Sequence, residues 1–331
     1  MTNFNDIEYT LIISELINDA FYSNLSNRGK ISEIRQFSEI LLRKILNIGS
    51  DRNIVIGKLT QPAFRKNATS NDGASEELKK LPENRQKELL DIIETFRSTS
   101  NEATHTNHIE TFTDDDLNDV TDSLFSLYAF LFEEYFLKYP IDINTNPSVL
   151  FNFSLLPPII RYKTLNYLFV SGYQNIYVSD KLVLAMLKTK GKKFAIDWID
   201  KNKKDLLSQP YPNSQQKTIF FNEFLDKTIS NNKDVINRIS SEDEKKYVYN
   251  QLMNITEQEL NDFLNSFPFK NNFELLLDKI NKVSDYIDNH GVMYQTFEEA
   301  VEHYKKYVVE GESPEIMELK NIMDFVYMGR K

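Results

Sequence analysis

Residues 113–140, TDDDLNDVTDSLFSLYAFLFEEYFLKYP, are the stretch on which the fold prediction depends. Thr113 can cap a helix by accepting hydrogen bonds from its first free amides, and the acidic residues 114–116 complement the positive end of the helix dipole. The apolar part, 124–137, is shorter than the roughly 20 residues that a membrane span needs, and it carries charges. Pro140 ends the pattern because proline cannot continue a helix. We therefore expect a central core helix here.

Helical patterns extend outward from this stretch in both directions. Residues 30–50 place their apolar side chains on one side of a helix, and another helical segment opens at Pro82, where a first turn tolerates proline. Only 9 glycines and 10 prolines occur among 331 residues, which favours helices over a sheet. Beyond Pro158 many shorter helical patterns with brief joints are typical of stacked helical hairpins. The predicted fold class is all-α.

The length of the chain indicates two domains of ordinary size. Residues 141–158 hold several prolines and are interpreted as a connection between them. We therefore expect a helical bundle at 1–140, the connection at 141–158, and a C-terminal all-helical domain of stacked hairpins at 159–331.

Composition excludes several kinds of site. Without cysteine, the chain can form no disulfide, zinc–thiolate site or thiol nucleophile. It has no phosphate-binding glycine loop or dinucleotide fingerprint, and we expect neither a metal nor a cofactor. The net charge of −10 repels nucleic acid as a whole, so contact with RNA would have to be local. We find no signal-peptide pattern and no membrane span, and expect a cytoplasmic protein.

Arg97, Asn101 and His105 follow one another at intervals of four residues. Four residues advance a helix by about 400°, so the three side chains share a face if the helix reaches His105. One interpretation is a solvated or ion-paired helix face. The other is metal-free RNA cleavage, in which histidine transfers protons, arginine binds the phosphate and asparagine orients the reacting groups.

An earlier segment carries a second row, Arg35, Glu39 and Arg43. The two rows could face each other across a helical bundle, with Glu39 paired to Arg97 or to Arg35. A partly buried carboxylate with arginines within reach is best explained as a structural ion pair.

Residues 188–204, KTKGKKFAIDWIDKNKK, concentrate lysines in an otherwise acidic chain. Lys192 and Lys193 in this segment could contact phosphates or a partner. The alternative interpretation is the solvated face of two helices.

These motifs carry a family resemblance. Through RQFSEILLRKIL at 35–46 and FRSTSNEATH at 96–105, residues 1–140 resemble a HEPN-type helical domain, of the variety found beside restriction and phage-defence systems. The following part of the chain is similar to abortive-infection proteins of low-GC bacteria. The resemblance implies a helical bundle that often forms a homodimer, with the polar row near the dimer interface.

The resemblance also implies a function in bacterial antiviral defence by abortive infection, as a metal-independent endoribonuclease activated by a phage or host protein. Its catalytic residues would be Arg97, Asn101 and His105. The RNA-binding residues would be Arg35 and Arg43, together with Lys192 and Lys193 of the lysine-rich segment. Seven residues separate Arg97 from His105, which is more than active members of the family usually have. The alternative is a non-catalytic helical module that recognises a phage or host protein or RNA.

Overall fold

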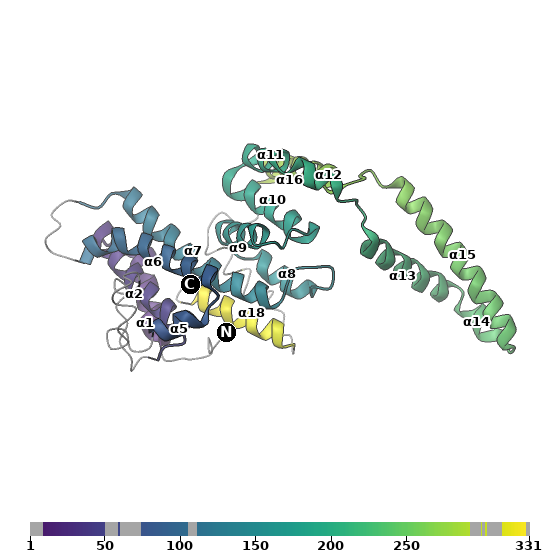
Figure 1. The fold of residues 1–331 in the computed structure, drawn as a ribbon, viewed down its shortest axis with the longest axis horizontal. Coiled ribbons are helices and arrows are strands. Elements are labelled where there is room, and N and C mark those ends of the chain that lie inside the picture. The colour runs from purple at the N-terminus through teal and green to yellow at the C-terminus, as the bar shows by residue number, and fades with distance from the viewer. Residues whose placement is uncertain are drawn as a thin grey trace. The chain divides into compact units, whose positions relative to one another are not determined.

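The computed structural model describes residues 9–49, 59, 74–104, 111–291, 299, 302 and 313–328. These residues form helices and no strand, so the predicted all-α class is confirmed (Figure 1). The chain divides into two compact units, one made of residues 1–178 and 292–331 and the other of residues 179–291. None of the described helices is both long enough and apolar enough to cross a membrane.

The first unit is a helical bundle built around α7. Its described helices are α1 (Thr10–Phe21), α2 (Asn27–Ile45), α5 (Ala74–Lys80), α6 (Glu83–Thr104), α7 (Asp114–Lys138), α8 (Pro147–Ser154), α9 (Pro158–Val170) and α18 (Pro314–Tyr327). Helices α2, α6, α9 and α18 all pack against α7. The expected central core helix is therefore confirmed.

The sequence of α7 explains its position. The Thr113 hydroxyl accepts the Asp116 amide while the Asp116 carboxylate accepts the Thr113 amide, which satisfies two of the amides that open a helix. Further along, α7 is almost fully buried and apolar apart from Glu133 and Glu134, and such a helix belongs in the centre of a bundle. The buried aromatic residues are Tyr128, Phe130, Phe132, Tyr135 and Phe136.

We interpreted the prolines between 141 and 158 as the mark of a connection between domains, but two of them begin helices. Pro147 and Pro158 each stand at the start of a helix, α8 and α9, where a missing amide hydrogen costs nothing. Phe153 of α8 packs against Phe132 and Phe136 of α7. The segment that we interpreted as a connection is thus part of the first bundle.

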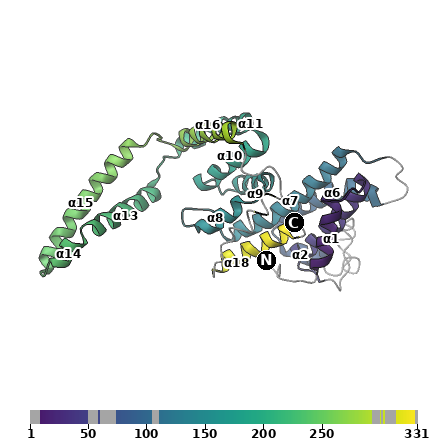
Figure 2. The same ribbon diagram turned by 180° about the vertical axis from the view of Figure 1, so that it is seen from behind.

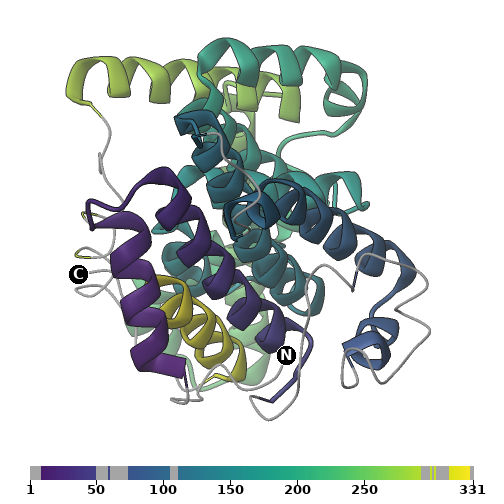
Figure 3. The same cartoon turned by 90° about the vertical axis from the view of Figure 1, so that its left-hand side faces the viewer.

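The end of the described chain returns to the first unit. Phe325 of α18 stacks on Phe37 of α2, with ring centroids 6.2 Å apart, and α18 also packs on α7 and α8. Figure 3 shows α18, in yellow, beside the purple N-terminal helices. The compact units therefore have other limits than the domains expected from the sequence, and those domain boundaries stay a prediction.

The second unit holds most of α10 (Ile176–Lys190) and six further helices. These are α11 (Lys192–Lys201), α12 (Lys203–Ser208), α13 (Ser214–Asn231), α14 (Lys233–Arg238), α15 (Glu242–Ser266) and α16 (Asn272–His290). Helices α11 and α12 pack on α16, and Lys279 of α16 forms an ion pair with Asp180 of α10. Helices α13 and α15 pack on each other as a hairpin (Figure 2).

Candidate functional site

The predicted polar row begins on an unbroken helix. Because α6 runs from Glu83 to Thr104, Arg97 and Asn101 belong to one helix and lie one turn apart. The Asn101 side chain and the whole of His105 lie outside the described parts of the structure. Arg97 is partly exposed, and its Nε donates to Glu94 Oε2 at 2.9 Å. This hydrogen bond raises the pKa of Arg97 above its ordinary value.

The second row lies on α2. Arg43 Nη2 donates to Glu39 Oε1 at 3.4 Å, and Arg43 Nη1 donates to the carbonyl of Gly49. Burial lowers the pKa of the Arg35 guanidinium, and the nearby charge of Glu39 acts in the opposite direction. The structure thus gives Glu39 an ion pair with Arg43, its neighbour one turn on. The expected pairing of Glu39 with Arg97 or with Arg35 stays a prediction.

Arg28 shows how the two rows are related. Its Nη1 donates to the carbonyl of Ala103 at 3.5 Å, and its guanidinium lies 5.1 Å from the centre of the Phe112 ring. The start of α2 thus lies beside the end of α6, and since the two helices pack together we infer that they run antiparallel. The sequence analysis did not include Arg28, although it precedes Arg35 by two helical turns on the same face.

Antiparallel packing also places Arg35. Two turns of α2 correspond to about 10.5 Å, and the same distance back along α6 from Ala103 leads to residues 96–97. By this count Arg35 and Arg97 occupy corresponding positions along the two helices. For the proposal below we call Arg28, Arg35 and Arg97 the arginine face. Helices α2 and α6 pack together, and whether the two rows face each other stays a prediction.

Lys192 and Lys193 belong to the second unit, whereas the arginine face belongs to the first. Both lysines open α11, directly after Gly191. Lys192 Nζ lies 3.9 Å from Asp285 Oδ1 on α16, and Lys193 is exposed.

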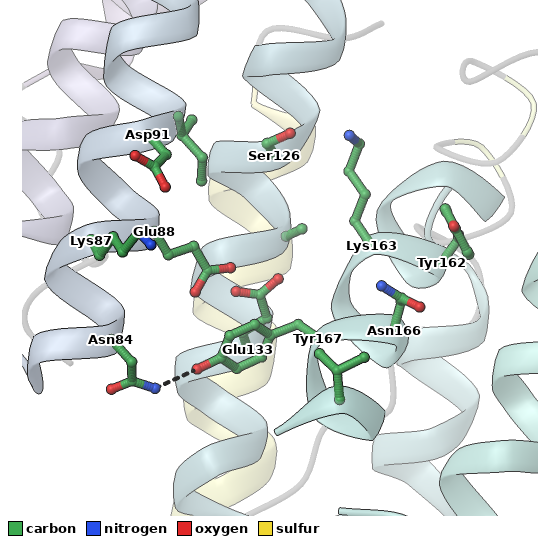
Figure 4. Close-up of a pocket in the computed structure, with 13 residues that line it drawn as sticks. Asn84, Lys87, Glu88, Asp91, Ser126, Glu133, Tyr162, Lys163, Asn166 and Tyr167 are labelled. Atoms are coloured by element: carbon green, nitrogen blue, oxygen red, sulfur yellow. Dashed lines mark hydrogen bonds between the residues drawn. The ribbon is translucent and has the colours of Figure 1, made fainter. Parts of the chain in front are cut away.

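A groove of about 540 Å³ opens between α6, α7 and α9, on the other side of α6 from Arg97. Glu88 precedes Arg97 by nine residues, which corresponds to a rotation of about 180°. The groove is lined by Glu88 and Asp91 of α6, Glu133 of α7, and Lys163 and Tyr167 of α9 (Figure 4). In the close-up the carboxyl groups of Glu88 and Glu133 point toward each other.

Beneath the groove lies a buried charged cluster centred on Arg85. Its side chain is 1% exposed, and Nη1 donates to Glu133 Oε2 at 2.8 Å and also to Glu88. Nε donates to Glu134, and Nη2 to the carbonyl of Phe130 at 3.2 Å. The guanidinium also stacks on an aromatic ring, 3.8 Å from the centre of Phe130. We call Arg85, Glu88, Glu133 and Glu134 the Arg85 cluster.

One cation and three carboxylates cannot all be charged at low cost in a buried site. Burial and the neighbouring Glu88 raise the pKa of Glu133 well above its ordinary range, against the opposing effect of Arg85. Burial also raises the pKa of Glu88. Both raised pKa values favour the protonated form of a carboxyl group, and the two groups face each other in the groove.

Such a pair has two physical interpretations. Paired carboxyl groups with shifted pKa values, set at a groove, can give and take a proton in acid–base chemistry. A buried and fully hydrogen-bonded ionic cluster can also simply fix α6 to α7. Sequence signals for the cluster exist: Arg85 stands on the core side of α6 with Leu89 and Ile93, and Glu133 interrupts the apolar run of α7.

Replacing Glu133 by glutamine should reduce the dependence of stability on pH. The folded wild type binds a proton that the unfolded chain releases at ordinary carboxyl pKa, so its unfolding free energy falls as pH rises through the raised pKa. The glutamine side chain can still accept a hydrogen bond from Arg85 and donate one to Glu88, but it does not ionise in this pH range. Urea denaturation from about pH 5 to about pH 9 measures this slope. The control is Asp91→Asn, which removes an exposed carboxylate of the same groove. Equal slopes in wild type and Glu133→Gln would show that the pKa of Glu133 is not raised.

No group of three or more histidine, aspartate or glutamate side chains in the described part of the chain is placed to hold a metal ion. Comparison of the chain with protein-family models, with curated proteins and with solved structures finds no match.

Proposed function

We propose that this protein acts on RNA in antiviral defence, and that the arginine face binds the RNA phosphates. The observation that carries the proposal is the packing of α2 on α6, with Arg28 donating to the carbonyl of Ala103 near the end of the described part of α6. Guanidinium groups bind phosphate oxygens through paired hydrogen bonds, which makes arginine well suited to this contact. The resemblance of residues 1–140 to a HEPN-type domain supports the same function.

The surroundings of Arg97 fit a site that exchanges partners. Its present partner, Glu94, lies on the same helix, and the pair is partly exposed. Exposed ion pairs of this kind contribute little to stability, so a phosphate can displace Glu94 at small cost. Because the protein carries a net charge of −10, RNA would be held only at such a local concentration of arginines.

RNA cleavage would use the rest of the row. In the sequence His105 follows Thr104, where the described part of α6 stops. The negative end of a helix dipole favours the imidazolium form of a histidine placed there. The ribose 2′-oxygen attacks the phosphorus and loses its proton to water, and the imidazolium protonates the leaving 5′-oxygen, which leaves a 2′,3′-cyclic phosphate. Asn101 orients the phosphate, and Arg97 stabilises the charge that develops on it. The proposed site of action is the cytoplasm, and the proposed active form is a homodimer, as in the family that the chain resembles.

Substituting the arginine face should weaken RNA binding and reduce its salt dependence. Each lost phosphate contact lowers the slope of log K against log salt concentration by about 1. Fluorescence anisotropy with labelled tRNA at several salt concentrations would compare wild type with Arg97→Ala and Arg35→Ala. Lys79→Ala removes an equally charged, exposed side chain from the same unit and serves as the control.

The proposal fails if Lys79→Ala weakens binding as much as Arg97→Ala does. It also fails if the double variant Lys192→Ala, Lys193→Ala abolishes binding while the arginine variants leave it unchanged. In that case the RNA contact would belong to the second unit.

A second function, a non-catalytic module that recognises a phage or host protein, has its own support. The α13–α15 hairpin leaves large side chains exposed, among them Tyr247, Tyr249 and Ile255 of α15. A groove of about 320 Å³ near its α14 end is lined partly by Ile239 and Leu252. Exposed aromatic side chains are enriched at protein interfaces. An absence of RNA binding and of RNA cleavage in the wild type would favour this function.

A further inference from the structure

The groove between α6, α7 and α9 has carboxyl groups on one wall and an amide and an aromatic ring on the other. Glu88 and Asp91 lie one turn apart on α6, and both line the groove. Asn166 and Tyr167 line it from α9, across the groove from α6 (Figure 4). Its volume of about 540 Å³ is within the range of small-molecule sites. The groove is therefore large enough to hold a ligand and polar enough to orient it.

Arg85 fixes the three helices that form this groove. Its guanidinium pairs with Glu88 of its own helix and with Glu133 of α7, and it lies 4.4 Å from the centre of the Tyr167 ring of α9. The Tyr167 hydroxyl in turn accepts a hydrogen bond from the Asn84 amide at 3.3 Å. A groove that is held open in this way loses little conformational freedom when a ligand binds.

The charges around the groove are not balanced. The Arg85 cluster holds three carboxyl groups around one guanidinium, and Asp91 adds an exposed carboxylate at the groove itself. Of the two lysines that line the groove, Lys163 is paired with Asp122 at 2.8 Å, and Lys87 remains to balance the rest. Among the described side chains here, carboxyl groups thus outnumber cations. Such a groove favours a positively charged ligand.

An organic ammonium ion suits this lining better than a metal ion does. In the described part of the chain, no three acidic or histidine side chains are grouped to hold a metal. An ammonium group has three N–H donors, and the carboxylate oxygens of Glu88 and Asp91 are acceptors for them. Apolar lining residues are available for the carbon atoms of the ligand, namely Ile92, Ala129 and Val170.

We propose that this groove binds a small organic ammonium ion, an amine on a short apolar chain, whose N–H groups donate to Glu88 and Asp91. The chain of the ligand lies against the apolar lining, and the Asn166 amide can bond to a polar group at its far end. The groove lies on the other side of α6 from Arg97, so this site does not depend on the proposed action on RNA.

Isothermal titration calorimetry of the full chain tests the site, with pentylamine and 1,5-diaminopentane as probes and 1-pentanol as the neutral analogue. Wild type should bind one equivalent of amine, and should bind 1-pentanol at least about tenfold more weakly because a hydrogen bond to a charged group is missing. Asp91→Asn should weaken amine binding by a similar factor. Its side chain is exposed, so the variant is expected to fold.

Glu83→Gln is the matched control for Asp91→Asn. Glu83 is an exposed carboxylate at the start of the same helix and does not line the groove, so this variant should bind the amines as the wild type does. Ser126→Leu tests the place of binding, because it fills part of the groove without changing its charge and should abolish binding. The proposal is overturned if wild type binds neither amine saturably, if it binds 1-pentanol equally well, or if Asp91→Asn binds as tightly as Glu83→Gln.

The affinity for pentylamine should rise with pH from about 5 to about 8. A bound cation competes with protons on Glu88 and Glu133, whose pKa values are raised by burial, while the amine stays charged as a lysine side chain does. The charged and titratable groups around this pair are Arg85, Lys87 and Asp91 of α6, Glu134 of α7, and Tyr162, Lys163 and Tyr167 of α9. Glu133→Gln should reduce the rise. An affinity that is constant or falls over this range would overturn the proposal.

Discussion

Replacing Arg85 by methionine is expected to lower the free energy of unfolding by about 3–5 kcal/mol. Methionine fills much of the space beside the Phe130 ring, so the loss comes mainly from electrostatics. Without the guanidinium, Glu88, Glu133 and Glu134 share a buried site with no cation among their present hydrogen-bond partners. Urea denaturation at neutral pH, followed by circular dichroism, measures the change.

Lys87→Met is the matched control for this experiment. Lys87 is exposed on the same helix, and its loss should change the free energy of unfolding by no more than about 0.5 kcal/mol. The double variant Arg85→Met, Glu133→Gln should recover part of the stability lost in Arg85→Met, because it removes one of the stranded carboxylates. A loss below about 1 kcal/mol in Arg85→Met would show that the Arg85 cluster does not hold α6 to α7.

The fold class could be predicted because its signals are local. A capping threonine, three acidic residues and a long apolar run within 113–140 are enough to predict α7, and the structure contains it. The prolines at 147 and 158 were harder to interpret, since proline both ends helices and starts them. Only the packing of Phe153 on α7 shows that α8 belongs to the first bundle.

The Arg85 cluster could not be assembled from the sequence. Arg85 and Glu133 stand 48 residues apart, and their pairing depends on how α6 lies against α7. A charged residue at a core position signals that some partner exists, but it does not say which. The contact between α18 and α2 likewise joins segments that lie far apart in the sequence.

For the candidate site, the sequence predicted the helices that carry the polar residues better than it predicted their ion-pair partners. Helices α2 and α6, which carry the described parts of the two rows, pack together, because periodicity fixes the face that each helix turns toward a neighbour. Glu39 has Arg43 as its ion-pair partner, since a neighbour one turn away needs no particular tertiary arrangement. Arg28 was missed because it lies outside the motif, although it shares the spacing of the row.

The second large effect is expected in RNA cleavage. If the proposed function is right, the wild type cuts RNA without a metal, and His105→Ala lowers the cleavage rate by about 10²–10⁴-fold because the proton-transferring group is gone. Arg97→Ala should lower both cleavage and binding. His108→Ala, at the neighbouring histidine, is the matched control and should cleave at the wild-type rate.

The measurement that tests the central claim most directly is single-turnover cleavage of labelled tRNA in the presence of EDTA. It is carried out with extract from phage-infected cells and without it, and the purified protein is compared with His105→Ala. We expect products with 2′,3′-cyclic phosphate ends from the wild type and almost none from the variant, while both proteins bind the tRNA equally. Cleavage at the same rate in both proteins, or no RNA cleavage under either condition, would contradict the account.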